Sequence, residues 1–125
     1  MKLKQIKKEY LIIVITIILL ILFHKNIIRF GYESQVNQTC LEEKQKLFEE
    51  FNVGEILIRF ENFVSEEKAK EILESYGLTQ ESFNNHLSKV IVPKGTEAKW
   101  TCILLEKESE NVVRIYPKYE LVYHD

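Results

Sequence analysis

An unbroken apolar run near the N-terminus constrains this chain more than any other feature. From Tyr10 to Phe23 every residue is apolar or aromatic except Thr16. The Thr16 hydroxyl can bond to a backbone carbonyl one helical turn back, so it does not need water. A helix of this composition has no polar face to present to solvent, unlike a surface helix of a soluble protein. The run therefore predicts a helix inside a membrane.

The length of the run leaves two interpretations open. Fourteen helical residues cover ~21 Å of a ~30 Å hydrocarbon core, and a run this short also fits a cleaved signal peptide. Two features favour an uncleaved anchor: no small-residue cleavage site follows Phe23, and apolar residues resume at Ile27 and Ile28. We therefore predict a signal-anchor helix over residues 10–30, in contact with membrane lipid, after a basic tail over residues 1–9.

The charges divide the chain into two parts. Residues 1–30 carry a net charge of +5, and the remaining 95 residues carry −7. The six bases of the first part are Lys2, Lys4, Lys7, Lys8, Lys25 and Arg29. Four of them precede the apolar run and two follow it, so the positive-inside rule predicts a cell-membrane protein with its N-terminus in the cytoplasm and residues 31–125 outside. An acidic outer part would repel nucleic acid, which we exclude as a partner.

Residues 31–52 predict a juxtamembrane linker followed by a short helix. Residues 31–38 are polar and show no periodicity, which is typical of a linker. Thr39 with Glu42 three residues later is a capping-box pattern, which predicts a helix over about residues 40–51. The apolar side of this helix would consist of Leu41, Leu47, Phe48 and Phe51.

Residues 53–125 predict one small α/β domain. Apolar and polar residues alternate over residues 55–61, which predicts a half-buried strand with Ile56 and Ile58 on its inner face. A helix follows, with Ser65 as its N-cap and with Gly77 ending it as in a Schellman motif. The inner side of this helix would consist of Ala69, Ile72, Leu73 and Tyr76. Two further strands are predicted over residues 89–92 and 112–116.

Three stretches of this domain have more than one interpretation. Residues 79–87 are ambiguous and fit a turn with a short strand around residues 83–87. Residues 96–107 fit either a helix capped by Thr96 or a strand with alternating side chains. Pro117 interrupts the last strand, so the residues after it are either an edge continuation or an outgoing tail.

Several motifs of this domain resemble those of a known protein family. They are an apolar-Arg-Phe strand ending, a Ser-Glu-Glu-x-Ala helix start, a Tyr-Gly-Leu helix end and a Val-Pro-x-Gly-x-Glu-x-x-Trp segment, at residues 58–60, 65–69, 76–78 and 92–100. Residues 53–121 thereby resemble the prodomains and small inhibitors of subtilisin-type proteases. The resemblance implies a ferredoxin-like βαββαβ fold and favours a helix over residues 96–107. It also implies that the tail after the last strand, with Tyr119, Leu121 and Tyr123, contacts a subtilisin-like protease.

No sequence pattern is typical of a catalytic or metal site. His24, His86 and His124 lie far apart and have no cysteine partner at a spacing that binds metal. Adjacent acids such as Glu66 and Glu67 point about 100° apart on a helix and stay solvated, which does not suit acid–base catalysis. We therefore predict that the chain is not an enzyme and binds no cofactor or metal.

Cys40 and Cys102 are the two cysteines of the chain, and both fall on the predicted outer side of the membrane. A disulfide between them would stabilise the fold by roughly 4 kcal/mol in the chain-entropy model and would hold the juxtamembrane helix on the domain. The alternative is two unpaired thiols that pack as small hydrophobic side chains. The sequence leaves the pairing open.

Together these features predict a single-pass membrane protein that presents a small protein-binding domain outside the cytoplasm. One hypothesis is a prodomain-like inhibitor or folding chaperone of a protease. The other is a structural or accessory subunit of a membrane complex, in which residues 10–30 pack in the membrane and the domain covers part of the complex.

Overall fold

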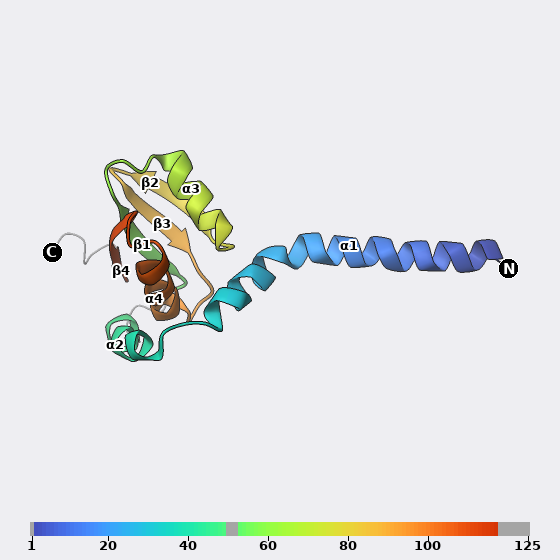
Figure 1. Ribbon diagram of the computed structural model, residues 1–125, viewed down its shortest axis with the longest axis horizontal. Helices are drawn as coiled ribbons and strands as arrows, with labels where there is room; N and C mark the ends of the chain where they lie inside the picture. The colour runs from blue at the N-terminus through green and yellow to red at the C-terminus, as the bar shows by residue number, and fades with distance from the viewer. Residues whose placement is uncertain (1, 50–52, 118–125) are drawn as a thin grey trace.

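The computed structural model describes residues 2–49 and 53–117. A long helix, α1 (Lys2–Glu33), and a short helix, α2 (Gln38–Phe48), precede a mixed part of helices and strands. That part consists of β1 (Glu55–Phe60), α3 (Glu66–Ser75), β2 (Thr79–Asn84), β3 (Leu87–Ile91), α4 (Glu97–Lys107) and β4 (Val112–Tyr116). We call β1–β4 with α3 and α4 the α/β unit. Figure 1 shows the N-terminal part of α1 projecting away from this unit, whereas its last turns bend toward the unit.

The four strands form one antiparallel sheet in the order β2-β3-β1-β4. Strand β1, one of the two central strands, pairs with β3, where Ile56 lies opposite Val90, and with β4, where Ile58 lies opposite Ile115. The helices α3 and α4 each connect two strands and lie on the same side of the sheet (Figure 1). The sheet therefore has an inner face under the two helices and an outer face.

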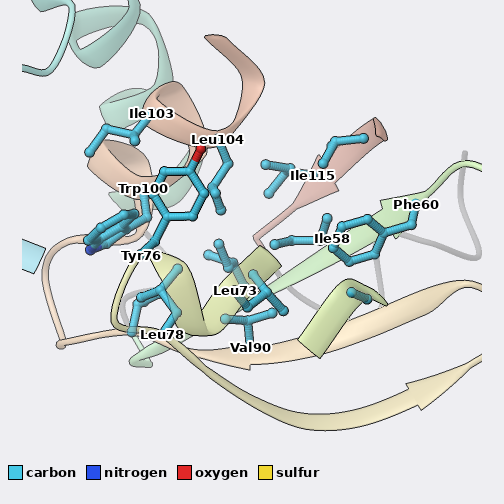
Figure 2. Close-up of a cluster of buried hydrophobic side chains, with 14 of the residues drawn as sticks. Ile58, Phe60, Leu73, Tyr76, Leu78, Val90, Trp100, Ile103, Leu104 and Ile115 are labelled. Carbon is cyan, nitrogen blue, oxygen red and sulfur yellow. The ribbon is translucent and has the colours of Figure 1, made fainter. Parts of the chain in front are cut away.

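The hydrophobic core lies between the inner face and the two helices. Ile56 and Ile58 are fully buried, as predicted for the inner face of β1, but Leu57 between them is also buried, so the strand is not half-buried as predicted. Leu73 of α3 and Trp100 of α4 belong to the same buried cluster. Figure 2 shows Leu73 close to Ile58 and Val90 of the sheet, and Trp100 beside Tyr76.

Helix α3 begins and ends as its sequence predicts. The Ser65 hydroxyl accepts a hydrogen bond from the Lys68 amide at 3.1 Å. At the other end, the amides of Gly77 and Leu78 donate to the carbonyls of Glu74 and Leu73, and Gly77 has a φ of +77°. This is the Schellman motif, in which glycine avoids the cost of a left-handed backbone.

The structure corrects the prediction for residues 79–87. In place of a turn and a short strand around residues 83–87, β2 begins at Thr79 and pairs with β3. The connecting turn is formed by Asn85 and His86, whose φ values are +52° and +63°. Positive φ at both central residues is the geometry of a type I′ hairpin turn. The prediction was wrong because Asn-His lacks the glycine by which such turns are usually recognised.

Residues 96–107 adopt the helical interpretation as α4. Thr96 precedes the helix, but its hydroxyl donates to the Pro93 carbonyl and makes no side-chain cap. Instead, the Glu97 carboxylate accepts hydrogen bonds from the amides of Gly54 at 2.7 Å and Gly95 at 3.0 Å. This carboxylate is almost fully buried and joins the start of β1 to the start of α4.

The helix predicted over residues 40–51 forms as α2, with a different cap. The Asn37 side chain accepts from the Cys40 amide at 3.0 Å, so the prediction that a Thr39 capping box starts the helix is wrong. Asparagine is at least as good an N-cap as threonine, and here it begins the helix two residues earlier. Phe48 is buried in the core, Leu47 is exposed, and Phe51 lies outside the described residues.

Helix α1 is longer than predicted and continues through Glu33 into the segment expected to be a linker. It is long and apolar enough to span a membrane, with a mean hydropathy of 2.6 in its apolar part and no residue of that part buried. The Thr16 hydroxyl donates to the Ile12 carbonyl at 2.8 Å, as the sequence suggested. The apolar surface of α1 is therefore exposed and not packed against the rest of the chain.

Candidate functional site at the junction of helix α1 and the α/β unit

The last turns of α1 pack directly against the α/β unit. We call this contact the α1 junction. From α1 it contains Lys25, Arg29, Tyr32 and Glu33, and from the α/β unit it contains Tyr76, Gly77 and Trp100. No linker separates the long helix from the folded part at this contact.

Arg29 and Gly77 form the first contact of the junction. The Arg29 guanidinium donates to the Gly77 carbonyl at 2.6 Å and also to the Asn26 side chain. A Cβ atom at position 77 would lie 2.6 Å from the Lys25 carbonyl oxygen. Glycine is therefore needed twice at this position, for its positive φ and for the close approach of α1.

Three aromatic rings form the centre of the junction. The ring centroids of Tyr32 and Tyr76 lie 4.6 Å apart, and Trp100 meets Tyr76 edge-on at 6.3 Å. The fully buried Trp100 indole donates to the Glu33 carboxylate at 2.9 Å. A buried indole N–H needs an acceptor, and here α1 supplies it.

Tyr76 also connects the ends of α3 and α4. Its hydroxyl donates to the Glu108 carboxylate at 2.6 Å. Burial, this hydrogen bond and the negative charge of Glu108 raise the pKa of Tyr76 well above its ordinary value of 10.0. Tyr76 is therefore a neutral donor over the whole physiological pH range.

A disulfide between Cys40 and Cys102 joins α2 to α4, with the two Cα atoms 5.9 Å apart. The two cysteines that the sequence left either paired or free are thus brought together. The bond closes a loop that contains β1, α3, β2 and β3. It holds α2 against α4.

The other side chains considered from the sequence form no catalytic arrangement within residues 2–49 and 53–117. The Nδ1 atom of His24 lies 2.7 Å from the Ile21 carbonyl oxygen, and that of His86 lies 3.2 Å from the Val64 carbonyl oxygen. Among these residues no group of three His, Cys, Asp or Glu side chains is placed to hold a metal ion. His124 and the predicted partner-binding residues Tyr119, Leu121 and Tyr123 lie outside the described part of the chain.

The outer face of the sheet is a second candidate surface. It has a buried apolar centre, where Leu57 of β1 lies beside Tyr116 of β4, and next to them Arg59 faces Arg114. On β3, the Lys89 ammonium lies 3.3 Å from the Glu55 carboxylate and 3.7 Å from that of Glu81. The hydrogen bond to Glu55, followed by the charges of Glu55 and Glu81, raises the pKa of Lys89. This face thus carries several charged side chains around an apolar centre.

Sequence patterns do not indicate these junction contacts. Arg29 was one of the two bases after the apolar run and Tyr32 fell within the predicted linker, and the structure gives both residues partners in the α/β unit. Glu33 was assigned to a polar linker, and it accepts from an indole 67 positions later. Local periodicity carries no signal for contacts over such separations.

The geometry of the junction suits a fixed connection between two parts of the chain. Within the described residues, every buried side-chain nitrogen and oxygen has a hydrogen-bond partner. Its donors and acceptors are therefore occupied by one another, as expected of a structural contact. Comparisons with models of protein families, with curated proteins and with solved structures find no match for this chain.

Proposed function

We propose that this chain is a non-enzymatic, single-pass protein of the cell membrane that presents a protein-binding domain outside the cytoplasm. The observation that carries the proposal is the apolar surface of α1. Side chains such as Leu20, Ile21 and Leu22 are 54%, 64% and 68% exposed. Water makes an apolar surface of this extent unfavourable, and a lipid bilayer removes that cost.

Two independent features support the orientation. The four lysines before the apolar run outnumber the two bases after it, which favours a cytoplasmic N-terminus. The disulfide between Cys40 and Cys102 lies on the other side of that run. Because disulfides persist in oxidising compartments, it supports an extracytoplasmic α/β unit.

The order of the elements supports a ferredoxin-like fold for this unit. The chain order β1-α3-β2-β3-α4-β4 and the sheet order β2-β3-β1-β4 are those expected of such a fold. This agrees with the resemblance to prodomains and inhibitors of subtilisin-type proteases. A fold hosts many functions, so the choice of partner depends on the surface.

We assign partner binding to the outer face of the sheet and to the chain that follows β4. The outer face carries the half-buried cations Arg59 and Lys89 around Leu57 and Tyr116, which are themselves only 3% and 8% exposed. The partner is a protein, and the resemblance points to a subtilisin-type protease. The residues after Pro117, with Tyr119, Leu121 and Tyr123, would extend this surface toward the protease cleft.

Inhibition of subtilisin by the full chain in detergent micelles tests this proposal. We expect the full chain to slow hydrolysis of a chromogenic peptide, and a variant lacking residues 118–125 to lose the effect. Arg59→Glu should weaken inhibition because it reverses a charge on the outer face. Lys94→Glu, at an exposed position in the β3–α4 loop, is the matched control and should inhibit like the parent. Ordinary digestion of the chain with no slowing of the protease would count against the proposal.

The exposure of α1 also favours the second candidate, an accessory subunit of a membrane complex. The same apolar side chains that suit lipid can pack against the helices of another membrane protein. Photo-crosslinkers at Leu22 and at Arg59, introduced one at a time in cells, distinguish the two roles. Crosslinks from Leu22 to a membrane protein, with none from Arg59, would favour the accessory subunit.

A further inference from the structure

The turn between α3 and β2 touches α1 at the height where a membrane-spanning helix meets the bilayer surface. A Cβ atom at Gly77 would lie 2.6 Å from the Lys25 carbonyl oxygen and 3.1 Å from the Cγ of Arg29. Helix α1 continues through this point to Glu33. The height of the turn along α1 is therefore fixed by its contact with Lys25.

The length of the apolar segment limits where the bilayer can end. The purely apolar run ends at Phe23, and a hydrocarbon core of ~30 Å that starts at Tyr10 ends near Phe30. Lys25 lies between these two positions. The headgroup layer adds about 5–8 Å on each side of the core. The turn thus lies within the headgroup layer if the core ends near Phe23. A core that ended near Phe30 would place the polar turn and Arg29 in hydrocarbon, which is unfavourable, so the core ends near Phe23.

A groove of about 420 Å³ opens at this height between α1 and the end of α3. Its lining residues are Ile27, Ile28, Gly31, Tyr32, Gln35 and Ser75. Ile27 is 57% exposed and continues the apolar surface of the helix into the groove. At Gly31 a Cβ atom would meet no other atom within 4 Å, so the groove has room along α1.

The charges beside the groove fit a phosphodiester. Lys25 and Arg29 are half-buried on α1 at the height of the turn, next to the lining residues of the groove. The Arg29 guanidinium has five N–H groups, and its bonds to Gly77 and Asn26 leave others for a further acceptor. Cations are usual partners of phosphate oxygens. Because the chain outside residues 1–30 carries −7, these two cations, and not the overall charge, would attract a phosphate.

We infer that a phospholipid of the surrounding bilayer occupies this groove. Its phosphate lies beside Lys25 and Arg29, and the start of an acyl chain lies along Ile27 and Ile28. The α/β unit then rests on the bilayer surface. This inference depends on the proposed membrane-spanning role of α1.

Fluorescent probes on the full chain in phosphatidylcholine nanodiscs test the inference. An environment-sensitive fluorophore is attached to one new cysteine at a time, with the native disulfide kept oxidised. The positions are Ser75 beside the groove, Phe63 at the opposite end of α3, where the side chain is 72% exposed, and Leu20 within the apolar run. We expect spin-labelled headgroups to quench the Ser75 probe strongly and the Phe63 probe weakly, and acyl-chain spin labels to quench the Leu20 probe.

The three probes separate failure of the inference from failure of the proposed anchor. If the Leu20 probe is quenched but the Ser75 probe is quenched no more than the Phe63 probe, the anchor stands and the lipid site is overturned. If the Leu20 probe is also unquenched, the proposed anchor falls and the lipid site with it.

Filling the groove adds a second, independent measurement. Gly31→Leu places a side chain in the open space at Gly31, and leucine also suits a helix. We expect it to reduce quenching of the Ser75 probe and to leave quenching of the Leu20 probe unchanged. Unchanged quenching at Ser75 would overturn the groove as the place where the lipid binds.

Discussion

Three buried polar side chains connect parts of this chain that are distant in sequence. The Trp100 indole donates to Glu33 of α1, the Tyr76 hydroxyl donates to Glu108, and the Glu97 carboxylate accepts from the Gly54 amide. An unpaired buried polar group costs about 1–3 kcal/mol, so removing one partner costs more than one ordinary hydrogen bond. These pairs therefore fix the arrangement of the helices around the apolar core.

Tyr76 is expected to keep its proton above pH 10, the ordinary pKa of a tyrosine side chain. Its pKa in the folded chain is raised by burial and by Glu108, whereas in the unfolded chain it ionises near the ordinary value of 10.0. Above pH 10 the folded state thus binds the extra proton, and its stability falls by up to about 1.4 kcal/mol per pH unit. The contribution of Tyr76 to stability is complete below pH 10 and is lost as the pH rises above that value.

Tyrosinate absorbance of the folded chain above pH 10 measures this effect. The chain has six tyrosines, and Tyr76→Phe leaves five. We expect the parent and the variant to reach the same amplitude before alkaline unfolding, because Tyr76 does not contribute. A smaller amplitude in the variant would show that Tyr76 ionises normally. Glu108→Gln serves as a control, because it removes the negative charge of Glu108 but keeps an acceptor for the Tyr76 hydroxyl.

The residues that set local structure could be predicted from the sequence, whereas those of the α1 junction could not. Ser65 and Gly77 act within one or two helical turns, so local patterns identify them. Glu97 also lies at the start of its helix, but one of its two amide partners is 43 positions away. The junction depends on side chains that meet after folding, and nothing near Glu33 in the sequence indicates Trp100.

Among the helices and strands, α3 could be predicted from its local sequence, whereas the hairpin of β2 and β3 could not. Helix α3 has a cap, a buried side and a terminator, and each agrees with the others. Strand β2 has few apolar side chains, and its inner face is set by pairing with β3. Propensity alone did not decide whether residues 96–107 form a helix or a strand, because their apolar side chains also alternate. The tertiary contacts of α4 with α2 and the sheet select the helix.

Gly77→Ala is expected to separate α1 from the α/β unit. The substitution imposes a left-handed backbone on alanine, at about 1–2 kcal/mol. It also places a Cβ atom 2.6 Å from the Lys25 carbonyl oxygen, and such a clash adds about 1–3 kcal/mol. Because Trp100 is the single tryptophan and donates to Glu33, its emission should shift to the red as α1 moves away.

Gly95→Ala is the matched control for this substitution. Gly95 has a φ of +93°, and a Cβ atom there meets nothing within 4 Å. It should therefore show the backbone cost without a change in Trp100 emission. Denaturant unfolding and emission spectra in detergent micelles compare the two variants. Equal destabilisation with equal emission would mean that the contact between Gly77 and α1 is unimportant.

For the whole molecule, the net charge of −2 conceals two parts of opposite charge. Residues 1–30 carry +5 and the rest of the chain carries −7. The disulfide between Cys40 and Cys102 lies in the acidic part, and a separation of 62 residues makes its contribution roughly 4 kcal/mol in the chain-entropy model. The charges on either side of α1 should therefore affect oxidation of the cysteines. By the positive-inside rule they set the orientation of the chain, and the orientation decides whether Cys40 and Cys102 lie in an oxidising compartment.

Replacing the four N-terminal lysines by glutamine tests this effect. The variant retains Lys25 and Arg29 as the bases beside the apolar run, so the positive-inside rule now places residues 31–125 in the cytoplasm. In that reducing compartment we expect Cys40 and Cys102 to be free thiols that react with a maleimide under denaturing conditions without prior reduction. The parent chain should react with the maleimide only after it has been reduced. The variant Cys40→Ser, which cannot form the disulfide, is the reference for the gel mobility of a chain without the bond. A disulfide that persists in the glutamine variant would contradict this prediction, because it would show that the lysines before α1 do not set the orientation of the chain.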